Sequence, residues 1–117
     1  ETQRIGDAAQ ENGVAMAMHM AGSPIAALAS VHCAAATENF LVLENHSVDH
    51  PEWNELVEGL PNPLIQEGYI DVPETPGLGF TDLNEAMVRE HIDLDQPGYF
   101  EPTTEWDNER SHDRLWS

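Results

Sequence analysis

Two continuous apolar runs, separated by a stretch of small residues, dominate the first half of the chain. They occupy residues 14–18 and 40–43. Between them, Ser23-Pro24 is a helix start, with serine at the N-cap and proline at the first helical position. Unbroken apolar runs are typical of parallel strands that are covered on both faces. Residues 13–44 therefore predict a strand, a helix and a second strand of a parallel α/β fold.

Helical spacing of apolar residues indicates two helices, and in the central one it predicts the face that packs against the sheet. Residues 1–12 form the end of a helix that stops at Asn12-Gly13. Its apolar stripe consists of Ile5, Ala8 and Ala9. The stripe expected for the central helix consists of Ile25, Leu28, Ala29, His32, Cys33 and Ala36.

The second half alternates short elements with proline- and glycine-rich stops. We expect a short helix at residues 52–58. Residues 64–72 would form a hairpin or an extended excursion that turns at Glu67-Gly68. A further helix would begin at Thr81 or Asp82, with a capping box completed by Glu85, and would end near His91. The polar residues 93–117 predict an extended tail.

The net charge limits the choice of partners. The chain has 22 acidic residues and 4 basic ones, for a formal net charge of −18. Such a surface repels nucleic acid phosphates and anionic membranes, so we expect neither as a partner. The composition suggests a protein that works in high salt, where screening weakens self-repulsion.

Cysteine content and chain ends indicate the compartment. The lone cysteine, Cys33, excludes an internal disulfide and favours a reducing compartment, so we expect a cytoplasmic location. No apolar run approaches the length of a membrane-spanning helix, and we expect no signal peptide. Because the chain starts at Glu1 rather than at a methionine, and no helix start precedes the first element, we expect a piece of a longer protein.

Two residues at the strand ends are candidates for chemistry. His19 and Glu44 follow the two apolar runs, and ligands bind at the carboxyl ends of parallel strands. A histidine can both take and give a proton near neutrality. We expect Glu44 to be a buried carboxyl that stays protonated beside a ligand carboxylate and donates to developing negative charge. The alternatives are a hydrogen-bonded core histidine and a solvated or paired surface glutamate.

A polar loop after the second run offers another interpretation. His46, Asp49 and His50 are possible metal ligands, but their spacing matches no strong metal signature. His46 lies just past the second strand, so we expect it to line a pocket and to contact the substrate.

The motifs in this order resemble a known family. They are Val-Ala-Met-Ala-Met-His at 14–19, Ser23-Pro24, His-Cys-Ala-Ala-Ala-Thr at 32–37, Asn-Phe-Leu-Val-Leu-Glu at 39–44 and Pro-Gly-Leu-Gly at 76–79. Together they resemble the C-terminal part of the enolase superfamily. The resemblance is to its mandelate racemase-like sugar-acid dehydratases (gluconate, galactonate, xylonate and mannonate types), of haloarchaeal type.

The resemblance implies an α/β fold that is the C-terminal portion of a (β/α)8-type barrel, plus a C-terminal segment returning to an α+β capping domain. Residues 1–60 would be the partial barrel segment, and residues 61–117 the C-terminal extension. A full barrel needs about 200 residues or more, so this chain cannot close one.

The resemblance also implies a chemistry. A magnesium ion would hold the carboxylate of a sugar acid, His19 would act as base and acid, and Glu44 would hydrogen-bond the enediolate oxygen. The magnesium ligands and the aspartate that orients the histidine lie on earlier strands, so no metal ligand is assigned in this chain. The partners of this chain would be the rest of the barrel or identical subunits. Dehydratase and racemase activities both stay open.

Three interpretations remain at this point. The chain is part of a sugar-acid dehydratase, inactive and poorly stable alone; or an inactive truncated remnant; or a small acidic protein that binds a metal or a partner through His46, Asp49 and His50.

The charge predicts a dependence of folding on salt. We expect refolding to become more complete as sodium chloride rises from dilute buffer to molar concentrations, because the Debye length falls from about 10 Å at 0.1 M to about 3 Å at 1 M. Circular dichroism across a salt series measures it, and full stability in dilute buffer would contradict the high-salt interpretation.

Overall fold

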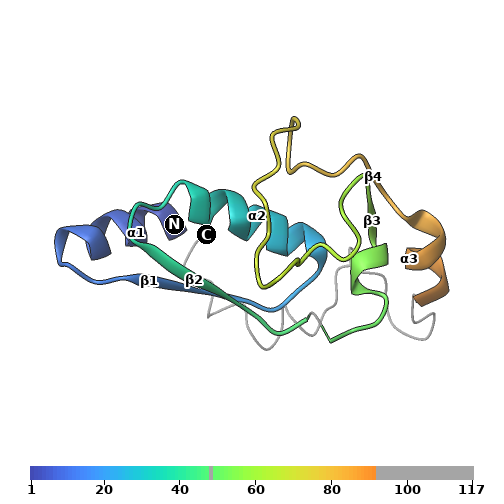
Figure 1. The fold of residues 1–117 in the computed structure, drawn as a ribbon, viewed down its shortest axis with the longest axis horizontal. Coiled ribbons are helices and arrows are strands. Elements are labelled where there is room, and N and C mark those ends of the chain that lie inside the picture. Colours follow the sequence, from blue (N-terminus) through green and yellow to red (C-terminus); the bar gives the residue numbers. More distant parts are fainter. Residues whose placement is uncertain (48, 92–117) are drawn as a thin grey trace, which may run out of the picture.

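Two parallel strands and the helix that joins them form the centre of the molecule (Figure 1). In this computed structural model, which describes residues 1–47 and 49–91, β1 (Met16–Met20) pairs with β2 (Phe40–Asn45). The helix α2 (Pro24–Ala35) connects them, as parallel strands require a crossover. The α/β arrangement predicted from the apolar runs is therefore observed. The predicted tail at 93–117 lies outside the described residues.

Both strands end two residues later than predicted. His19 is thus inside β1, and Glu44 is inside β2, directly opposite His19 in the register. The ladder has an irregularity near its start, where Met16 pairs with Phe40 but Ala17 pairs with Val42. Leu41 is therefore an extra residue in β2, as in a β-bulge.

The start of α2 is confirmed. Ser23 is the N-cap in extended conformation and Pro24 is the first helical residue, although the Ser23 hydroxyl makes no cap hydrogen bond. At the other end, the Thr37 hydroxyl donates to the carbonyl oxygen of Cys33 at 2.7 Å and satisfies one of the final carbonyls.

The face of α2 that packs on the sheet differs from the predicted stripe. Its buried residues are Pro24, Ala27, Leu28 and Val31, whereas the predicted Ala29 and Ala36 are exposed. Because nearly every position of this helix is small or apolar, the spacing of apolar residues does not define one face. Contact with the strands does so instead.

The predicted first helix is observed, with Asn12 as its C-cap, but its apolar residues are not the buried ones. In α1 (Thr2–Glu11) the buried residue is Gly6, and Ile5 is 58% exposed. Gly6 lies against Thr37 so closely that a Cβ there would come within 2.9 Å of the threonine methyl. The apolar face that contains Ile5 lies uncovered in the described chain.

The second half differs most from expectation. The predicted helix at 52–58 is a single 3-10 turn, η1 (Trp53–Glu55), followed by β3 (Val57–Glu58). This strand pairs antiparallel with β4 (Asp82–Leu83), where a helix start was predicted. The helix α3 (Glu85–His91) begins later, and Asn84 accepts a hydrogen bond from the Met87 amide at 3.2 Å. The predicted capping box at Asp82 is therefore wrong.

The predicted turn of the hairpin is confirmed. Gln66 and Tyr69 pair across Glu67-Gly68, and both turn residues have positive φ, at 51° and 85°. Positive φ at two central residues is the geometry of the tight turns that join hairpin strands.

One hydrophobic cluster joins the two halves of the chain. It contains Met20, Ala27, Leu28, Trp53 and Leu64, with Ile70, Leu78 and Phe80 among the residues packed against it. The elements η1, β3, β4 and α3 lie beyond the ends of β1 and β2 (Figure 1). The division at residue 60 stays a prediction. None of the helices in the described part is long and apolar enough to cross a membrane.

Burial predicts which leucine carries stability. Leu28 is fully buried, whereas Leu41 is 68% exposed. We expect Leu28→Ala to lower the free energy of unfolding by about 2–5 kcal/mol through lost contacts and a cavity. The matched Leu41→Ala should change it by less than about 0.5 kcal/mol. Denaturant unfolding measures both, and equal losses would contradict this core.

Candidate functional site

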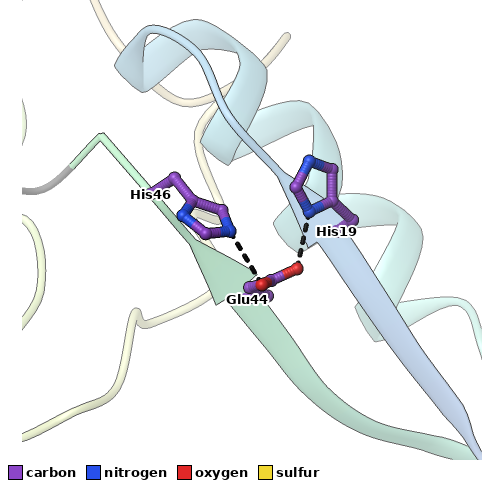
Figure 2. A group of neighbouring side chains, drawn as sticks. All are labelled: His19, Glu44 and His46. Atoms are coloured by element: carbon purple, nitrogen blue, oxygen red, sulfur yellow. Dashed lines mark hydrogen bonds and ion pairs between the residues drawn. The ribbon is translucent and has the colours of Figure 1, made fainter.

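Three side chains from the paired strands meet on the face of the sheet away from α2 (Figure 2). His19 comes from β1, and Glu44 and His46 come from β2 and its end. Side chains alternate along a strand, so residues 44 and 46 point to the same side. The amide of His46 donates to the carbonyl oxygen of Met20 at 3.2 Å. The backbone pairing thus continues to His46.

Glu44 lies between the two imidazole rings. Its Oε2 is 2.5 Å from His19 Nδ1, and its Oε1 is 2.7 Å from His46 Nε2. The ring centroids are 5.3 Å apart. Each carboxylate oxygen therefore serves a different histidine, and the three side chains form one hydrogen-bonded group.

The two histidines determine the ionisation of Glu44. The hydrogen bond from His19, and after it the one from His46, lowers the pKa of Glu44 below its ordinary value. An ionised carboxylate only accepts hydrogen bonds, so the protons lie on His19 Nδ1 and His46 Nε2. In this tautomer of the neutral ring, the free lone pair of His19 is on Nε2, the atom able to accept a proton.

The expectation of a buried, protonated Glu44 is wrong for this structure. The side chain of Glu44 is 54% exposed, and those of His19 and His46 are 67% and 58% exposed. The hydrogen bonds from His19 and His46 lower the pKa of Glu44, and they outweigh desolvation, which raises it. The alternative of a paired surface glutamate describes the observed state.

The loops that follow the two strands are tied together at Gly22. The amide of Gly22 donates to the Ser47 hydroxyl at 2.8 Å, and the Trp53 indole donates to the Gly22 carbonyl at 2.8 Å. These bonds fix the strand ends on which the three side chains stand. The sequence did not predict that Ser47 and Trp53 hold the strand ends together. Only their position soon after the second apolar run indicated this role.

The predicted grouping of His46 with Asp49 and His50 does not form. Among residues 1–47 and 49–91, the one set of three possible metal ligands within reach of one another is His19, Glu44 and His46. If the second strand had been predicted to end at Asn45, the alternation of side chains would have placed His46 on the same side as Glu44. His46 lies beside His19 and Glu44, and its expected contact with the substrate stays a prediction.

The chain resembles known proteins along most of its length. Residues 1–86 match the family model described as enolase C-terminal domain-like. A D-xylonate dehydratase of Haloferax volcanii is 46% identical over 92 residues, covering 79% of this chain and 22% of that protein. A crystal structure of a mandelate racemase/muconate lactonizing enzyme-like protein from Rubrobacter xylanophilus has a TM-score of 0.74 and 39% identity. The match covers 83% of this chain and 24% of the Rubrobacter xylanophilus chain. The chain spans less than a quarter of the length of either relative.

The geometry predicts how Glu44 titrates. Its pKa should lie below the ordinary glutamate value and rise towards it in His46→Ala, which removes one donor; His50→Ala should leave it unchanged. Carboxyl NMR shifts against pH measure this directly. Because the pKa is lowered, the pairing stabilises the fold at neutral pH, and that stability is lost as the pH falls through the Glu44 pKa. An unshifted Glu44 would contradict the pairing.

Proposed function

Because the chain belongs to the enolase C-terminal domain-like family, we propose that it supplies the last strands of a sugar-acid dehydratase barrel, with His19 as the group that moves the proton. The family resemblance read from the sequence is thereby confirmed. The observation that carries the proposal is the pairing of His19 with Glu44 at the carboxyl ends of adjacent parallel strands. The similarity to a D-xylonate dehydratase supports the substrate class.

The proposed reaction removes water from an aldonic acid. His19 Nε2 takes the proton from the carbon next to the carboxylate, and the electron pair left behind expels the β-hydroxyl. The same imidazole, now protonated, gives its proton to the departing hydroxyl, so that water leaves. The Nδ1 contact with Glu44 supports this role because it keeps the lone pair on Nε2.

Glu44 and His46 take supporting roles in this proposal. Glu44 orients the ring of His19 and stabilises its protonated form. To donate a hydrogen bond to a substrate oxygen, Glu44 would first have to leave one histidine and take up a proton. His46 contacts Glu44 through Nε2, so its Nδ1 remains for a substrate hydroxyl or carboxylate.

The three side chains do not suit magnesium. Mg²⁺ prefers octahedral oxygen ligands and keeps several waters, whereas this group offers two imidazoles and one carboxylate. We therefore assign the magnesium of the proposed enzyme to ligands outside this chain and derive no step through it.

Exposed apolar side chains support a partner that supplies further barrel strands. Leu41 and Val42 of β2 are 68% and 50% exposed, and Val14, just before β1, is 57% exposed. Both strands have one edge without a partner strand in the described chain. We propose that the rest of a barrel, or identical subunits, covers these surfaces. The lone Cys33 agrees with a cytoplasmic setting.

A chimera tests the function. In it, this chain replaces the matching 92-residue segment of the Haloferax volcanii D-xylonate dehydratase. We expect magnesium-dependent conversion of aldonic acids to keto acids in high salt. His19→Asn should lower kcat by about 10²- to 10⁴-fold, because it removes the acid–base group, whereas the matched His50→Asn should not.

Other outcomes separate the alternatives. Turnover by the chain alone would contradict the need for a partner. Exchange of the α-proton with solvent deuterium, without keto acid, would mean a racemase. A folded chimera without either activity would indicate an inactive remnant.

A further inference from the structure

We propose that His19, Glu44 and His46 form a binding site for a zinc-class divalent cation. The inference goes beyond the dehydratase function and does not depend on it. Each residue offers one ligand atom, and these atoms lie within 4.8 Å of one another. Two imidazole nitrogens and one carboxylate oxygen are a donor set that Zn²⁺ uses in open sites, with a fourth position left for water.

The distances allow a cation to enter after small side-chain movements. Zinc–ligand bonds of about 2.0–2.2 Å in a tetrahedron put ligand atoms about 3.4 Å apart. The two contacts of Glu44 now measure 2.5 and 2.7 Å. A cation placed among the three atoms lengthens both contacts, and the protons on the two coordinating nitrogens leave, because metal ligands bind deprotonated.

The backbone already holds the three residues in place. His19 and Glu44 are register partners on paired strands, and the His46 amide is bonded to Met20. Little backbone ordering therefore remains for a cation to impose. All three side chains are more than half exposed, so they can rotate and the site has an open approach. The net charge of −18 raises the local concentration of cations.

The same donor set selects between cations. Nitrogen ligands suit zinc and the neighbouring transition metals, whereas magnesium and calcium prefer oxygen. A cation held here takes lone pairs from the histidines and separates His19 from Glu44. It therefore competes with proton transfer by His19, a consequence that rests on the proposed function, while the binding itself does not.

Calorimetric titration of the full chain with zinc chloride tests the site. We expect one zinc per chain and, in a parallel titration, magnesium binding at least about 100-fold weaker. Glu44→Gln and His46→Ala should each weaken zinc binding by more than about 10-fold, since even partners behind the ligands are worth about 10- to 100-fold. The matched His50→Ala removes an exposed histidine outside the group and should bind as the unchanged chain does.

Thermal unfolding followed by circular dichroism separates lost binding from lost folding. Zinc should raise the unfolding midpoint of the unchanged chain and of His50→Ala, but not that of Glu44→Gln or of a second variant, His46→Gln. Unchanged zinc affinity in the Glu44 and His46 variants would overturn the proposal, as would absence of zinc binding and of any midpoint shift. Neither result bears on the chimera's activity with magnesium, so failure of one proposal leaves the other standing.

Discussion

The register between β1 and β2 is the constraint on which the site depends. It places His19 opposite Glu44 and brings His46 to the same side of the sheet. Because side chains alternate along a strand, a slip of β2 by one residue would turn both Glu44 and His46 towards α2 and leave His19 without them. On β1, the burial of Met18 and Met20 keeps His19 on the opposite face, since turning this strand over would expose both methionines. Hydrophobic packing on one face thereby fixes the polar geometry on the other.

The loops beyond the strands protect this arrangement from fraying. Gly22 uses both of its backbone polar groups to join the two loops, through Ser47 and Trp53. Trp53 is 3% exposed and belongs to the cluster that contains Leu28. The core and the strand ends are thus linked by a residue that serves both, and the exposed side chains stand on a well-supported backbone.

The sequence revealed those parts of the fold that local signals determine. Ser23-Pro24 and the apolar runs locate the helix and both strands, and Glu67-Gly68 locates a turn, since each signal acts within a few residues. The pairing of Val57 with Leu83 had no such signal, because it joins positions far apart in the chain. Tertiary packing placed Asp82 in this strand pair instead of at the start of the predicted helix. At the site, the pattern singled out His19, Glu44 and His46. The ionised state of Glu44 was not predicted, because it depends on hydrogen bonds with the two histidines, and a second strand predicted to end at Leu43 did not indicate them.

The extra residue at Leu41 has a consequence for assembly. It offsets the backbone groups at the start of β2, so the free edge of that strand does not present an evenly spaced row of donors and acceptors. A flat strand from an unrelated chain, or from a misfolded copy, would lose hydrogen bonds when it docked there. A bulge of this kind is one of the features that blunt a strand edge against pairing with unrelated chains.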